Sequence, residues 1–161
     1  EIIDIAPDAV RSVRLTDRLG QTGYFSRPPG GNARSFTTAP PYQELEVASR
    51  LSLSTTALAI TRFAPEGAKL DTTLTTAPVA RHISETFDGL EIDLSAYQEP
   101  DGVWVTLRAI EAGEGARRAE AINEKVEGWA FKLSPFDWQD FTPAMDTLVV
   151  NPAPLSEAPS E

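Results

Sequence analysis

Residues 80–110 read ARHISETFDGLEIDLSAYQEPDGVWVTLRAI, and the fold is decided in this stretch. Apolar side chains alternate with polar ones at positions 90, 92 and 94, and again at 103, 105 and 107. A period of two is typical of half-buried antiparallel strands. Asp88-Gly89 and the run Glu-Pro-Asp-Gly at 99–102 are turn signals. The stretch therefore predicts a three-stranded meander over residues 81–87, 90–97 and 103–110.

A helix pattern follows the meander. Ala119, Ile122 and Val126 recur at spacings of three and four, and Gly128 stands where a helix end favours a left-handed residue. Residues 129–133 return to strand character, with Trp129 and Phe131 expected in the core. A meander whose apolar face is covered by one helix predicts an α+β layer.

The first half predicts a similar arrangement. Residues 10–16 and 24–27 form a hairpin pattern, and residues 34–38 a short third strand. From Tyr42 the pattern is helical, with an expected buried face that consists of Ala48, Leu51, Thr55 and Leu58. Residues 60–63 either finish that helix or start a strand, and residues 68–78 are either a loop or an edge strand.

The C-terminal part begins with a strong helix start. Ser134 is an expected cap, Pro135 follows at the first helical position, and Asp137 lies three residues after the cap. Residues 144–149 predict a short turn or strand, and residues 151–161 a disordered tail because they are rich in proline and nearly free of large apolar side chains. The prediction is antiparallel β-meanders each followed by a covering helix. Residues 1–150 form a single domain, with two sub-units at 1–66 and 79–150 as the finer alternative.

Composition argues against several functions. The chain has 161 residues, with 14 basic and 24 acidic side chains and a net charge of −10, which disfavours nucleic acid and anionic lipid as partners. It has no cysteine, which removes thiol catalysis, thiolate metal sites and disulfides. No apolar run approaches the ~18 residues that a membrane span requires, so we expect no direct membrane insertion by this chain.

We predict no catalytic, cofactor-binding or metal-binding residues. His82 is the one histidine, and it shares a strand face with Ser84, but their Cβ atoms should be ~6 to 7 Å apart with no orienting acid. We therefore expect His82 to face solvent. Glu91 and Asp93 share another strand face, where a soluble sheet ordinarily keeps charge. The acidic turn at residues 99–102 is too short for a calcium loop.

Aromatic side chains are the candidates for binding a partner. Phe136 and Trp138 cannot both face inward on one short helix, and we expect Trp138 to be the exposed one. Trp104, on the third strand of the meander, completes the set of possible partner-binding residues.

Four runs carry a family resemblance: TFDGL (86–90), DGVWV (101–105), EAIN (120–123) and GWAFKL (128–133). Together they resemble the C-terminal half of the bacterial domain-of-unknown-function 4340 family. Residues 3–5, 10–15 and 24–27 fit the opening of that half, so the resemblance covers nearly all of residues 1–149. Members are typically anchored by one N-terminal transmembrane helix and project into the periplasm, often beside gliding-motility-type ABC-transporter components.

The resemblance implies a function but no site, because no catalytic residues are known for that family. We expect a non-enzymatic extracytoplasmic accessory or protein-interaction module of an ABC-transporter-like assembly, anchored through a segment absent from this chain. Its partners would be envelope or membrane proteins. The alternatives are a carbohydrate-binding or carbohydrate-hydrolysing envelope domain that uses Trp138 with Glu91 and Asp93, and a purely structural spacer.

Overall fold

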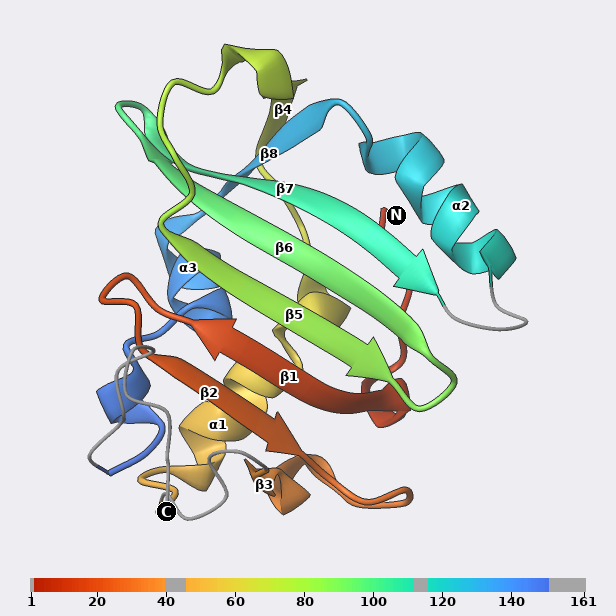
Figure 1. Cartoon of the computed structure of the whole chain (residues 1–161), viewed down its shortest axis with the longest axis vertical. Coiled ribbons are helices and arrows are strands. Elements are labelled where there is room, and N and C mark those ends of the chain that lie inside the picture. Colours follow the sequence, from red (N-terminus) through yellow and green to blue (C-terminus); the bar gives the residue numbers. More distant parts are fainter. Residues whose placement is uncertain (1, 40–45, 112–115, 151–161) are drawn as a thin grey trace.

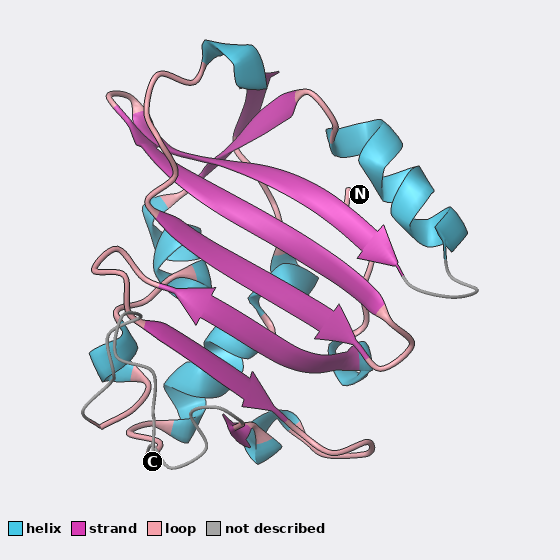
Figure 2. Ribbon diagram, in the orientation of Figure 1, coloured by secondary structure: helices cyan, strands magenta, loops and turns pink. Residues whose placement is uncertain are grey.

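The structure, a computed structural model, describes residues 2–39, 46–111 and 116–150. These residues form an eight-stranded antiparallel sheet and three α-helices (Figures 1 and 2). The strands are β1 (Val10–Thr16), β2 (Thr22–Ser26), β3 (Thr37–Thr38), β4 (Gly67–Leu70), β5 (Ala80–Thr86), β6 (Leu90–Glu99), β7 (Gly102–Glu111) and β8 (Trp129–Leu133). The helices are α1 (Arg50–Ala57), α2 (Ala116–Val126) and α3 (Pro135–Phe141). Single 3₁₀ turns occur at Pro7–Ala9, Ala33–Ser35, Ala59–Arg62, Asp71–Thr73 and Met145–Thr147.

The predicted meander is confirmed as β5, β6 and β7. Leu94 lies opposite His82 on one side and Leu107 on the other, so these three side chains share the buried face. The turns between the strands use glycines with positive φ, Gly89 at 96° and Gly102 at 136°, as the two turn signals predict.

Strands from both halves of the chain belong to the same sheet, in the order β3-β2-β1-β5-β6-β7-β8-β4. The first hairpin, β1 and β2, is confirmed and joins the meander because β1 pairs with β5. At the other edge β4 pairs with β8, so residues 67–70 take the edge-strand alternative. The third strand is only two residues long, because Asn32 caps a 3₁₀ turn over the residues before it.

One face of the sheet carries the hydrophobic core. Figure 1 shows α1 and α3 behind the sheet, whereas no described helix covers the face toward the viewer. Phe63 meets Phe131 of β8 and Phe141 of α3 edge to face, at ring-centroid distances of 5.9 and 6.2 Å. Ile3 and Ile5 from the N-terminal segment complete this core. Helix α2 packs beside the end of β7 (Figure 1). Gly128 follows the end of this helix with a φ of 82°.

Helix α1 differs from its prediction. It begins after Ser49, whose hydroxyl accepts the Ser52 N–H, and residues 42–45 lie outside the described residues. Leu51 is 64% exposed rather than buried, whereas Leu53 and Ala57 are fully buried. The predicted helix is therefore wrong over residues 46–49, where Val47 instead forms a bridge with Val149, and α1 is turned so that another set of positions meets the sheet.

Strand β8 and helix α3 follow the sequence more closely. Ser134 accepts the Asp137 N–H at 3.1 Å, so the predicted cap of α3 is confirmed. Phe131 is buried as expected, but Trp129 is exposed, because it lies at the end of β8 opposite Leu70 of the short edge strand β4. The expected final turn is the 3₁₀ turn Met145–Thr147, and the predicted tail, residues 151–161, lies outside the described residues.

Two buried charged side chains, Arg27 and Glu99, hold irregular segments of the chain against the sheet. Arg27 donates to the carbonyls of Val10 and Pro7, and its guanidinium lies 4.6 Å from the ring centroid of Phe36. At the other end of the molecule, the Glu99 carboxylate accepts the backbone N–H and the hydroxyl of both Thr75 and Thr76. The first charge fixes the entry of the chain into β1, and the second holds the threonine-rich segment over the end of β6.

Candidate functional site

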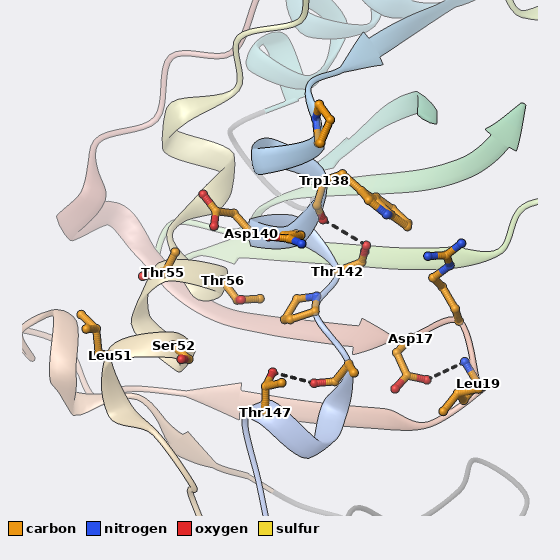
Figure 3. A pocket seen from close by; sticks show the side chains of 15 residues that line it. Asp17, Leu19, Leu51, Ser52, Thr55, Thr56, Trp138, Asp140, Thr142 and Thr147 are labelled. Atoms are coloured by element: carbon orange, nitrogen blue, oxygen red, sulfur yellow. Dashed lines mark hydrogen bonds between the residues drawn. The ribbon is translucent and has the colours of Figure 1, made fainter. Parts of the chain in front are cut away.

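A cleft of about 980 Å³ opens between α1, α3 and the turn after β1 (Figure 3). Its walls carry hydroxyl, carboxylate and apolar side chains together. The residues that line it include Asp17, Arg18, Leu19, Leu51, Ser52, Thr55, Thr56, Trp138 and Asp140. A concave site with convergent polar groups is the default place to look for a ligand.

Asp17 fixes one wall of the cleft. It is buried, and its carboxylate accepts the backbone N–H groups of Leu19 and Gln21 at 2.9 Å and of Met145 at 3.0 Å. The first two bonds close the turn after β1, as an aspartate does in an Asx turn. The third bond links that turn to the C-terminal 3₁₀ turn, 128 residues away in the chain. This wall of the cleft is therefore held in place by hydrogen bonds within the chain itself.

Arg18 and Trp138 form the adjoining wall. The Arg18 guanidinium carbon lies 5.7 Å from the centroid of the Trp138 ring, and the same side chain donates to the Gln98 amide oxygen at 3.2 Å. Cation–π geometry of this kind orients the cation without neutralising it. The pair spans from α3 to the end of β6.

Helix α1 presents a row of hydroxyls to the opposite wall. Ser52, Thr55 and Thr56 all line the cleft (Figure 3). Serine and threonine are poor helix formers because their hydroxyls compete for the backbone. Three of the four hydroxyl residues at positions 52–56 lie on the surface of the cleft, and the fourth, Ser54, donates to the Leu51 carbonyl.

His82 lies behind α1 and not in the cleft. Its ring is fully buried; Nε2 lies 2.9 Å from the Thr56 carbonyl oxygen, and the ring packs edge to face with Phe141 at 5.0 Å. Burial lowers the pKa of His82 to about 4, so the ring is neutral at neutral pH. The prediction of a solvent-facing His82 is wrong, because α1 and α3 cover the face of β5 that carries Ala80, His82 and Ser84.

A buried serine stands beside this histidine. Ser84 Oγ lies 3.4 Å from His82 Nδ1, on the same strand face, as the spacing predicts. With Nε2–H donating to the Thr56 carbonyl, Nδ1 accepts from the serine. Both side chains are essentially without solvent contact, so the pair has the composition of a nucleophile and base but no access for a substrate.

The expected partner-binding aromatics take different places from those predicted. Trp138 is 8% exposed and contributes to a cleft wall, whereas Phe136 is 82% exposed on the outside of the same helix. The prediction that Trp138 is the exposed one of the two is therefore wrong. Trp138 shares the inward face of α3 with Phe141, one turn later, whose ring packs against Phe63 and His82.

Trp104 lies far from the cleft and is also buried. Its indole N–H donates to Asp101 at 2.8 Å, which lowers the pKa of that carboxyl, and the Lys69 ammonium lies 4.4 Å from the ring centroid. These contacts account for Trp104 as a packed strand residue.

Glu91 and Asp93 occupy the face of the sheet that α1 and α3 do not cover. Asp93 lies opposite Ile83, and its carboxylate forms an ion pair with Arg81 at 2.5 Å. Trp138 lies on the other side of the sheet, so the three residues of the carbohydrate hypothesis do not meet in one site. The charged-face interpretation of the two acids agrees with their partial exposure.

Sequence reasoning missed the cleft itself. Its walls come from the turn after β1, from α1 and from α3, and no local pattern links three such distant segments. Two partial signals exist: the Asp17-to-Gly20 turn signature and the hydroxyl run at 52–56.

Comparison with known proteins adds no assignment: no family model, curated protein or solved structure matches the chain. The resemblance drawn from the four sequence runs therefore stays a prediction. Among the residues that the structure describes, no group of histidine and acidic side chains is arranged to hold a metal ion, and no helix is both long and apolar enough to cross a membrane.

Proposed function

We propose that the chain is a non-enzymatic protein-interaction module, and that it binds a segment of its partner in the cleft between α1 and α3. The observation that carries this proposal is the mouth of the cleft. Leu19 and Leu51, from opposite walls, are 78% and 64% exposed there. Large exposed apolar side chains beside a concave polar site are typical of protein interaction surfaces.

The chemistry of the cleft favours binding over catalysis. The side chain best suited to proton transfer near neutral pH, His82, is buried behind α1 and hydrogen-bonded to a backbone carbonyl. The Asp17 carboxylate is saturated by backbone N–H groups. His82 therefore does not reach a ligand in the cleft, and the Asp17 carboxylate is used to hold the turn after β1.

The cellular setting of the proposal rests on the family resemblance. We infer an extracytoplasmic position and a partner among envelope or membrane proteins, with ABC-transporter components as the first candidates. Fractionation of cells that make the full-length protein tests the location, and recovery in the cytoplasm would overturn that part.

The cleft is tested by site-specific photo-crosslinking in the same cells. A photoreactive amino acid at position 51 should give one discrete adduct with an envelope or membrane protein. The same amino acid at position 70 is the matched control, because Leu70 is also exposed but belongs to edge strand β4. No adduct from position 51, or equal adducts from both positions, would argue against the cleft as the interaction site.

A further inference from the structure

Two of the polar groups that line the cleft, a hydroxyl and a carboxylate, are available to a ligand because neither has a partner among the described residues. The Thr56 side chain is 2% exposed, and its hydroxyl forms no hydrogen bond there, while its carbonyl is held by His82. Figure 3 shows this hydroxyl-bearing side chain directed from α1 into the space between the helices. The only buried side-chain polar atom without a partner among the described residues is Glu111 Oε2, so the Thr56 hydroxyl stays open to the cleft and can bond a ligand or water there.

The second group is the carboxylate of Asp140. It lines the cleft from α3, and in Figure 3 it extends toward the α1 side. Within the described residues it has neither an ion pair nor a hydrogen bond. It therefore differs from Asp17, the other acid of the cleft, whose carboxylate accepts three backbone N–H groups.

The cation of the cleft does not compensate Asp140. Arg18 lies over Trp138 and donates to Gln98, and no ion pair joins it to Asp140. Asp140 therefore offers a ligand an unpaired negative charge on the α3 side of the cleft, beside hydroxyls that can accept or donate hydrogen bonds. The apolar side chains Leu19 and Leu51 flank the entrance.

We propose that the occupant of the cleft is an extended polypeptide segment that carries a lysine or arginine next to a large apolar residue. The cation pairs with the Asp140 carboxylate, a donor of the segment meets the Thr56 hydroxyl, and the apolar side chain packs on Leu51. This inference rests on the proposed function, because it names the chemistry that the same cleft recognises. Charge complementarity selects a basic segment over a neutral or an acidic one.

The test uses three synthetic peptides titrated into the purified protein by calorimetry. They are acetyl-Gly-Leu-Lys-Leu-Gly-amide and two matched peptides with norleucine or glutamate in place of lysine. We expect the lysine peptide to bind roughly tenfold more tightly than the norleucine peptide, as one charge-assisted hydrogen bond provides. Added salt should reduce that preference.

Two cleft variants and one control make the result specific. Asp140→Asn should abolish the preference for lysine, and Thr56→Val, which is isosteric, should weaken all three peptides without lowering the melting temperature. Asp146→Asn is the control, because Asp146 is exposed and does not line the cleft; it should leave the preference intact. Equal binding of the three peptides, or a lysine preference that survives Asp140→Asn, would overturn the proposal.

Failure here is distinguishable from failure of the proposed function. A crosslinked partner at position 51 combined with no lysine preference would retain the interaction module and reject the basic segment. Binding of a neutral oligosaccharide such as maltoheptaose in the cleft, lost in Thr56→Val and unchanged in Asp140→Asn, would reject the basic segment in favour of a carbohydrate ligand.

Discussion

Asn123 on α2 hydrogen-bonds both backbone groups of Ala109 on β7. The Asn123 side-chain oxygen accepts the Ala109 N–H at 2.8 Å, and its amide nitrogen donates to the Ala109 carbonyl at 2.9 Å. Strand β8 pairs with β7 only at residues 103–105, so Ala109 lies on a part of β7 that β8 does not reach. One side chain therefore takes the place of a neighbouring strand at an edge that would otherwise be open to pairing.

Replacing Asn123 with alanine should destabilise the protein by about 1–2 kcal/mol. The substitution removes two hydrogen bonds at a partly buried site and leaves the backbone groups of Ala109 to water. Urea unfolding gives the free energy, and hydrogen exchange should show faster exchange at Ala109. Glu120→Ala on the exposed face of the same helix is the control and should change little. An unchanged exchange rate at Ala109 would contradict the assignment.

His82 should make stability depend on pH between about 6.5 and 4. Its pKa is lowered from 6.5 to about 4, first by burial, so the unfolded chain takes up a proton in this window and the folded chain does not. The free energy of unfolding should therefore fall as the pH is lowered, by up to about 3 kcal/mol, and should stop falling from this cause below pH 4.

The control for this prediction is His82→Gln, which keeps a donor for the Thr56 carbonyl. Whatever the stability of this variant, its free energy of unfolding should no longer fall as the pH is lowered from 6.5 to about 5. The pKa of Glu99 is lowered from 4.5, chiefly by the Thr76 hydroxyl, so its contribution begins to be lost only as the pH falls toward 4.5, and the upper part of the window reports His82. A slope that persists in His82→Gln would mean that another group is responsible.

Much of the sheet could be predicted because its signals are local. Strands β6 and β7 alternate apolar and polar side chains, and Gly89 and Gly102 stand at the turns that join the meander. The start of α3 is likewise decided by neighbours in sequence, through the Ser134 cap. These features depend on backbone preferences that a few adjacent residues determine.

The buried face of β5 could not be predicted in the same way. Ala80, His82 and Ser84 on one face are no more apolar than Ile83 and its neighbours on the other. Which face is buried depends on where α1 packs. The contact between them joins His82 to Thr56 of α1, which lies 26 residues earlier in the chain. The cleft also depends on how distant segments pack against one another, so its residues could not be recognised from local patterns.

Glu99 should control the order of the threonine-rich segment that precedes β5. Its carboxylate accepts the N–H groups and hydroxyls of Thr75 and Thr76, and glutamine in its place would turn an –NH₂ group toward some of those donors. We expect Glu99→Gln to speed hydrogen exchange at both threonines while exchange in β6 stays slow. Glu91→Gln, on the uncovered face, is the matched control. Equal protection of both threonines in the two variants would show that the carboxylate does not hold the segment.

Trp138 and Phe136, two residues apart on α3, should respond in opposite ways to substitution. Trp138 packs in the core and against Arg18, so Trp138→Ala should cost about 3 kcal/mol of stability, as buried aromatic truncations do. Phe136 is 82% exposed, so Phe136→Ser should stay within about 0.5 kcal/mol of the parent. Urea unfolding measures both, with Trp138→Phe as an intermediate that keeps an aromatic ring. A large loss in Phe136→Ser would mean that its side chain is covered in solution. In that case the outer face of α3, and not only the cleft, would have to be treated as an interaction surface.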